Sequence, residues 1–111
     1  MGAAVWRIRD AATFQALRRR GRRVRRDGLT VTWLPGPHDG TPPRVAYAVG
    51  RKVGNAVVRN RLRRRLQALV VELAPELPPG TYLIGTDASV AAFDHGDLRR
   101  TLRTVLSELP H

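Results

Sequence analysis

The sequence contains no cysteine, which excludes disulfide bridges and zinc sites that depend on cysteine ligands. Its histidines, His38, His95 and His111, lie far apart along the chain, and none has the spacing of a metal-binding motif. No apolar run approaches the roughly 20 residues that a membrane-spanning helix requires. The amino-terminal stretch also lacks the apolar segment of a secretory signal. We therefore expect a cytoplasmic protein that binds no metal ion through its own side chains and does not associate with a membrane.

Acidic side chains are scarce, with nine aspartates and glutamates against 20 lysines and arginines, and they are scattered along the chain. The sequence shows no serine–histidine–aspartate arrangement and no acidic cluster that would support hydrolysis. Gly50 and Gly54 are not followed by the Gly-Lys-Ser/Thr sequence of a phosphate-binding loop. We therefore expect no catalytic residue in the chain itself.

Positive charge is what the sequence has in excess. The 111 residues fit a single domain spanning residues 1–111, with 42% hydrophobic residues and a net charge of +11. Residues 1–65 hold 17 basic and three acidic residues, a net charge of +14, whereas residues 66–111 have a net charge of −3. This imbalance favours a polyanionic partner, nucleic acid first and an anionic membrane surface second. Lys52 is the only lysine, so nearly all of the positive charge comes from arginine. Arginine is suited to binding phosphate and to stacking on bases. A GC-rich coding bias would also favour arginine over lysine.

Apolar periodicity, turn residues and helix caps predict alternating helices and strands. Asp10 and Asn55 are N-cap candidates, and Asp94 or Asp97 would cap the last helix. Period-two alternation and β-forming residues predict the strands. The order helix, strands, helix, strand, helix favours a two-layer α+β or α/β sandwich. The expected helices are 11–20, a second that follows Asn55 and ends before Pro75, and a last one from Asp94 or Asp97 to about Leu109. The expected strands are 29–33, 44–49 and 82–84.

The helix that follows Asn55 combines an apolar stripe with a dense cationic surface. The arginines of residues 59–65 lie off the stripe, and no acidic residue between Lys52 and Arg65 offsets their mutual repulsion. A helix that tolerates such repulsion is expected to pair with an external polyanion, and a solvated basic face is the alternative. The helix N-terminus near Gly54 would add an anion site. The stripe, about 80° wide at about 100° per residue, consists of Val58, Leu62, Leu66, Leu69 and Leu73.

Aromatic residues make up only 5% of the chain. Phe14, Trp33 and Tyr47 are candidates for stacking on single-stranded RNA, and each could equally be a core residue. The arginine-rich segment 18–26 either contacts nucleic acid or forms a flexible arm.

Residues 51–64 read RKVGNAVVRNRLRR. This string resembles, without gaps, the signature K-K-[VI]-G-N-A-V-x-R-N-R-x-K-R of the protein subunit of bacterial ribonuclease P, where it begins the central helix. Phe14-Gln15 followed by Arg20-Gly21-Arg22 resembles the first helix of that family, and the strand 44–49 resembles the strand before the signature.

The resemblance implies both a fold and a function. The implied fold is an α+β (α/β sandwich) fold similar to the second domain of a ribosomal small-subunit protein. It has a four-stranded sheet packed against helices and a left-handed βαβ crossover through the basic central helix. The implied function is that of a ribonucleoprotein subunit. In that endoribonuclease, the RNA subunit binds Mg²⁺ and cuts precursor tRNA to make the mature 5′ end, and the protein contacts both RNAs.

Matching positions give two sets of site residues. The resemblance implies a cleft for the 5′ leader between the first helix and the sheet, where we place Phe14 and Arg18, with Trp33 and Tyr47 as further candidates. Arg18 departs from the family, which usually has a second aromatic residue there. The residues implied to dock on the catalytic RNA are Arg51, Lys52, Asn55, Arg59, Asn60, Arg61, Arg63 and Arg64.

Three other functions remain open at this point. A non-catalytic, ribosome-associated module for structured RNA would show the same salt-dependent binding. A DNA-binding regulator would place the basic helix in the major groove, but no second helix is placed for a helix-turn-helix. A self-sufficient nuclease would need the clustered carboxylates that the sequence lacks.

Overall fold

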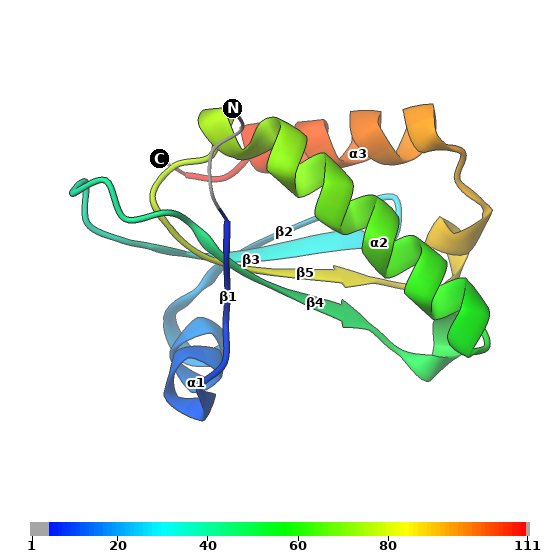
Figure 1. The fold of residues 1–111 in the computed structure, drawn as a ribbon, viewed down its shortest axis with the longest axis horizontal. Helices are drawn as coiled ribbons and strands as arrows, with labels where there is room; N and C mark the ends of the chain where they lie inside the picture. The colour runs from blue at the N-terminus through cyan, green and yellow to red at the C-terminus, as the bar shows by residue number, and fades with distance from the viewer. Residues whose placement is uncertain (1–4, 111) are drawn as a thin grey trace.

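The structure, a computed structural model, describes residues 5–110 (Figure 1). Its elements confirm the predicted α+β class. The helices are α1 (Ala11–Arg20), α2 (Ala56–Leu73) and α3 (His95–Ser107), with short 3-10 turns η1 (Arg51–Val53), η2 (Ala74–Glu76) and η3 (Ala88–Ala92). The strands are β1 (Trp6–Arg7), β2 (Arg22–Arg26), β3 (Leu29–Pro35), β4 (Arg44–Val49) and β5 (Gly80–Thr86).

The strands of the described residues form a five-stranded sheet in the order β1-β4-β5-β3-β2, one strand more than expected. At one edge, Trp6 and Arg7 of β1 pair in parallel with Arg44 and Val45 of β4. Two paired residues are too few to leave a periodic pattern in the sequence. The strands β4 and β5 are also parallel, and α2 connects them. Followed from β4 over α2 to β5 in Figure 1, the chain makes the left-handed crossover that the resemblance implied.

The arginine-rich segment 18–26 is folded and is not a flexible arm. Its first residues complete α1, and the rest form β2, which pairs antiparallel with β3 so that Val24 lies opposite Val31. Asp27 and Gly28 join the two strands with φ angles of 49° and 86°. Positive φ at both central residues is what a two-residue hairpin turn with the right-handed twist requires.

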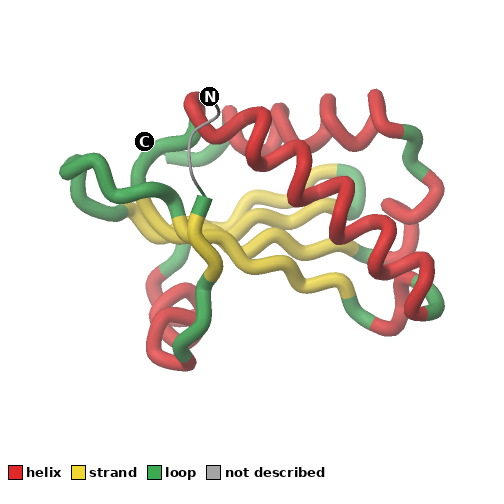
Figure 2. Tube along the Cα trace, viewed as in Figure 1, coloured by secondary structure: helices red, strands yellow, loops and turns green. Residues whose placement is uncertain are grey.

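The two faces of the sheet are covered unequally (Figures 1 and 2). The helices α2 and α3 lie together on one face, whereas α1 lies on the other face at one end of the sheet. The larger core, between the sheet and the α2–α3 layer, includes Val45, and the smaller cluster beside α1 includes Ala46 and Leu17. Neighbouring residues of β4 thus point to opposite faces of the sheet, as expected for a pleated strand. Much of the α1 face is left without a covering helix.

Carboxylate caps begin α1 and α3. The Oδ2 of Asp10 accepts hydrogen bonds from the hydroxyl and amide of Thr13, and the Oδ1 of Asp94 accepts one from the amide of Asp97 at 2.7 Å. These hydrogen bonds hold the pKa of both Asp10 and Asp94 below the ordinary value for aspartate. The stability that they contribute is therefore present above the ordinary pKa and is lost as the pH falls through the lowered one.

Candidate nucleic-acid interface

Helix α2 has the buried stripe and the cationic surface that its sequence predicts. The stripe faces the sheet, with Leu66 fully buried and Val58 half-buried. Arg61 and Arg64 lie off the stripe and are exposed to solvent. The helix is therefore anchored by leucines while its charged surface points outward. The buried residues of α2 are Leu62, Leu66, Leu69, Val70 and Leu73.

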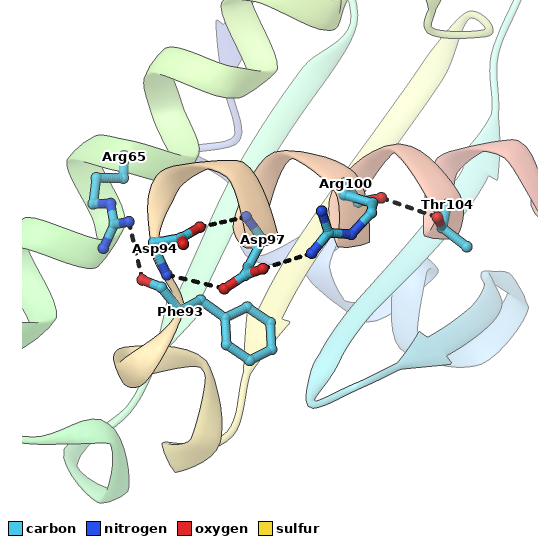
Figure 3. A network of polar contacts seen from close by, with 6 residues as sticks. All are labelled: Arg65, Phe93, Asp94, Asp97, Arg100 and Thr104. Atoms are coloured by element: carbon cyan, nitrogen blue, oxygen red, sulfur yellow. Dashed lines mark hydrogen bonds and ion pairs between the residues drawn. The ribbon is translucent and has the colours of Figure 1, made fainter.

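The two flanks of α2 face different neighbours. On one flank, the Nη2 of Arg65 donates to the carbonyl oxygen of Phe93 at 3.1 Å, just before α3 (Figure 3). On the other flank, Arg63 lines a pocket beside β1 and β4, and its Nη1 donates to the Oδ1 of Asn60 at 2.8 Å. A spacing of about 100° per residue puts residues 63 and 65 on opposite flanks, so both contacts follow from the helix geometry.

The arginines of α2 have no carboxylate partner among the described residues. The ion pairs found within residues 5–110 use arginines of β2 and α3 instead. In α3, for example, Arg99 pairs with Glu72 at 2.6 Å and Arg103 pairs with Glu76 at 3.1 Å. The Nε of Arg59 is buried and makes no hydrogen bond in this part of the chain. The cationic surface of α2 is therefore left for a partner from outside.

The turn before α2 extends this surface. Arg51 and Lys52 in η1 are both exposed. Gly54 has a φ of 157°, and a Cβ there would lie 2.9 Å from the Cγ1 of Val58, so the chain needs glycine to enter the helix. Asn55 then caps α2, its Oδ1 accepting the amide hydrogen of Val58 at 3.0 Å. Two cations thus flank a helix N-terminus, where backbone N–H groups favour anions.

The residues assigned to a leader cleft lie on opposite faces of the sheet. Phe14 and Arg18 belong to α1, where Phe14 packs on the smaller hydrophobic cluster and Arg18 is exposed. Trp33 and Tyr47 face the α2–α3 layer, so their assignment to a cleft beside α1 is wrong. Trp33 is only 4% exposed, and its ring centroid lies 6.4 Å from that of Tyr82 in the core. Phe14 and Arg18 are the predicted cleft residues that the structure brings together.

The alternation of side chains along β3 and β4 indicates which face of the sheet Trp33 and Tyr47 occupy. Leu29, Val31 and Trp33 share one phase of β3, and the first two are typical core residues, so Trp33 belongs inside with them. Tyr47 shares its phase in β4 with Val45, which is also in the core. The stacking interpretation rested on the aromatic side chain, whereas the phase of the strand decides which face it occupies.

The uncovered part of the α1 face has a floor of small residues that sequence reasoning missed. The strand register places Ala48 beside Gly85 and Gly85 beside Thr30. A Cβ on Gly85 would meet no atom closer than the carbonyl oxygen of Ala48, at 3.8 Å. Arg25 lies beside Thr30 at the end of this row. Its guanidinium group forms a 3.2 Å ion pair with Asp87. The part of this face beside α1 therefore carries small side chains that leave it open to solvent.

Within residues 5–110, no group of three or more histidine, aspartate or glutamate residues is placed to hold a metal ion. Asp94 and Asp97, which the sequence suggested as caps, together form the capping box of α3 (Figure 3). None of the helices in the described chain is long and apolar enough to cross a membrane.

Comparison with known sequences identifies similar proteins. The family model described as Ribonuclease P matches residues 3–110. The ribonuclease P protein component of Nocardioides sp. is 41% identical over 116 residues, which cover 98% of this chain and 98% of that relative. The ribonuclease P protein component of Gluconacetobacter diazotrophicus is 44% identical over 103 residues, covering 87% of this chain and 88% of the relative.

Solved structures share the fold. The RNase P protein from Thermotoga maritima has a TM-score of 0.82 at 20% identity, covering 95% of this chain and 98% of that one. The RNase P protein of Staphylococcus aureus has a TM-score of 0.81 at 20% identity, covering 92% and 93%. The similarity to these structures establishes the fold, and the similarity to the sequence relatives establishes the family. The chain belongs to the ribonuclease P protein family.

Proposed function

We propose that this chain is the auxiliary protein subunit of a ribonuclease P ribonucleoprotein in the cytoplasm. It binds the RNA subunit and precursor tRNA and assists removal of the 5′ leader, which gives the mature 5′ end of the tRNA. The catalytic centre and its Mg²⁺ ions belong to the RNA subunit in this proposal. The protein contributes contacts to the two RNAs and positive charge.

The observation that carries the proposal is the unpaired cationic surface on α2 and η1. A folded protein that keeps this many arginines together without carboxylate partners carries repulsion that an RNA backbone relieves. The residues that we assign to docking on the RNA subunit are Arg51, Lys52, Asn55, Arg59, Asn60, Arg61, Arg63 and Arg64.

The leader is assigned to the opposite face, beside α1. Phe14 is partly exposed there and offers a ring for stacking, and Arg18 offers a cation for phosphate. The floor formed by Ala48 and Gly85 leaves room for the bases of a single strand. The protein thus presents one face to the RNA subunit and the other to the substrate.

This arrangement explains how a protein without catalytic residues promotes cleavage. The RNA subunit and precursor tRNA are both polyanions, and their approach requires cations. Arginines held between them lower the repulsion and reduce the need for Mg²⁺ as a screening ion. A grip on the leader also favours precursor over mature tRNA.

Cleavage of precursor tRNA by the RNA subunit should be strongly stimulated by this chain at low Mg²⁺. The stimulation should shrink as Mg²⁺ rises, because the metal ion then provides the screening itself. Single-turnover cleavage across a Mg²⁺ series, with and without the protein, measures the effect. The protein alone is expected to leave the substrate intact.

Two outcomes would contradict the proposal. Tight RNA binding without stimulation at any Mg²⁺ concentration would favour a non-catalytic module for structured RNA. Cleavage by the protein in the absence of the RNA subunit would place catalytic groups in the chain itself.

Asn55 allows the start of α2 to be tested separately. Asn55→Ala should lower the free energy of unfolding by about 1 kcal/mol, because the amide of Val58 loses its cap. Asn55→Asp should keep the cap but place a negative charge among the docking residues, weakening RNA binding several-fold. Asn55→Ser keeps the cap without the charge and is the matched control. Urea unfolding and RNA titration measure the two effects, and equal RNA affinity for the aspartate and serine variants would remove this turn from the interface.

A further inference from the structure

We propose that a pocket between β1, β4 and α2 binds a single phosphate group of the RNA subunit's backbone. The pocket extends the docking surface of α2 onto the amino-terminal strand. The inference rests on the proposed function, since it names an additional contact to the same RNA.

Side chains from three elements converge on this pocket. Arg7 comes from β1, Tyr47 from β4, and Arg63 and Gln67 from α2. Its volume of about 270 Å³ is several times the roughly 30 Å³ that a water molecule occupies in the liquid. It is open to solvent on one side, so a phosphate group on the surface of a large RNA can enter it.

The sheet register explains how Arg7 reaches the pocket. Arg7 pairs with Val45, and side chains of paired residues lie on the same face of a sheet. Val45 belongs to the core under α2, so Arg7 also points to the α2 face. Tyr47 is two residues further along β4 and therefore on that face as well. Arg63 overhangs them from the flank of α2.

The charge in the pocket is uncompensated. No aspartate or glutamate of the described chain lines it. The side chain of Arg7 takes part in no hydrogen bond or ion pair within residues 5–110, and that of Arg63 bonds only to Asn60. A guanidinium group has five N–H donors, so both arginines keep most of their donors free. Two such groups beside one pocket repel each other unless an anion lies between them.

The hydroxyl of Tyr47 adds a neutral donor. Burial raises the pKa of Tyr47 to about 12, against the opposing effect of nearby Arg7, so the phenol stays protonated at neutral pH. No other described residue bonds to this hydroxyl. Two guanidinium groups, a phenol and the amide of Gln67 match a phosphate group, whose oxygens accept several hydrogen bonds at once.

The position of the pocket selects the RNA subunit over the leader. Five of the seven lining residues belong to α2 or face it, whereas Ile8 and Ala46 belong to the smaller cluster on the α1 side, on which Phe14 packs. A phosphate group bound in this pocket extends the row of RNA-backbone contacts proposed for Arg59 and Arg63.

Two variants test the pocket by different signatures in titrations of the RNA subunit against salt. Arg7→Ala should weaken binding roughly five-fold at physiological salt and lower the slope of log affinity against log salt by about one unit. Tyr47→Phe should weaken binding about three-fold to ten-fold at every salt concentration with an unchanged slope, because it removes a hydrogen bond but no charge. Arg7→Lys should restore most of the slope. The effect should not depend on the length of the leader.

The controls separate this inference from the proposed function. Arg9→Ala removes the same charge from an exposed arginine outside the pocket and should change affinity less than two-fold. Thermal unfolding of each variant shows whether it is folded. If Arg63→Ala weakens binding while Arg7→Ala and Tyr47→Phe do not differ from the wild type, the phosphate pocket is rejected and docking through α2 stands. A loss for Arg7→Ala without a change in slope would also reject it. If the wild-type chain does not bind the RNA subunit, both proposals fall.

Discussion

Alanine at Lys52, Arg61 and Arg64 together should weaken binding of the ribonuclease P RNA subunit about a hundred-fold at physiological salt. The slope of log affinity against log salt should fall by about three units, since each lost phosphate contact releases about one counterion fewer. All three side chains are exposed and have no ion-pair partner among the described residues. Their removal also relieves like-charge repulsion, so the melting temperature should stay the same or rise.

A second triple variant separates the docking surface from net charge. Alanine at Arg99, Arg100 and Arg103 removes the same formal charge from α3, where each arginine is paired with a carboxylate. Exposed pairs of this kind contribute up to about 1 kcal/mol each, so this variant remains folded. Its RNA affinity should fall far less than that of the α2 variant. Equal losses in the two variants would mean that total charge, and not the surface of α2, determines binding.

Local patterns predicted most of the fold because they depend on residues close together in the sequence. The strand Arg44–Val49 has its predicted bounds, since six consecutive residues carry the β-forming pattern. The leucine stripe of α2 and the cap at Asn55 are also local, and both are present. The cationic surface proposed for docking is local for the same reason, because a single helix and the turn before it carry its residues.

Non-local pairings account for what the sequence did not reveal. The strand β1 exists only because Trp6 and Arg7 meet β4 from far along the chain. The arginine-rich strand β2 is held by its register with β3, and its composition alone resembles a flexible arm. The floor beside α1 is built from Thr30, Gly85 and Ala48 on three different strands, so no linear motif marks it.

The errors at Trp33 and Tyr47 have a common cause. An aromatic side chain is suited both to a core and to a base, so residue type alone does not choose between them. The phase of β3 places Trp33 in the core with Val31. The phase of β4 places Tyr47 under α2, where the edge of the sheet leaves it beside Arg7 instead of beside α1.

Leu66→Ala should lower the free energy of unfolding by about 2–5 kcal/mol, the range for removing a fully buried leucine side chain. Leu66 is 0% exposed and lies in the middle of the stripe that holds α2 on the sheet. The loss is a large share of the roughly 5–15 kcal/mol that stabilise a typical domain. Urea unfolding monitored by circular dichroism measures it.

The matched control lies in the same helix. Val57 is 66% exposed, so Val57→Ala should change the free energy of unfolding by less than about 0.5 kcal/mol. Under the proposed function the RNA subunit binds the folded protein, so saturating RNA should raise the melting temperature of Leu66→Ala. At a hundred times the dissociation constant, binding adds about 2.7 kcal/mol to the free energy of unfolding. This rise in melting temperature distinguishes a variant whose helix is poorly anchored from a variant that has lost its RNA-binding surface. A neutral effect of Leu66→Ala, or an equal effect of Val57→Ala, would show that the leucine stripe does not hold the cationic helix in place.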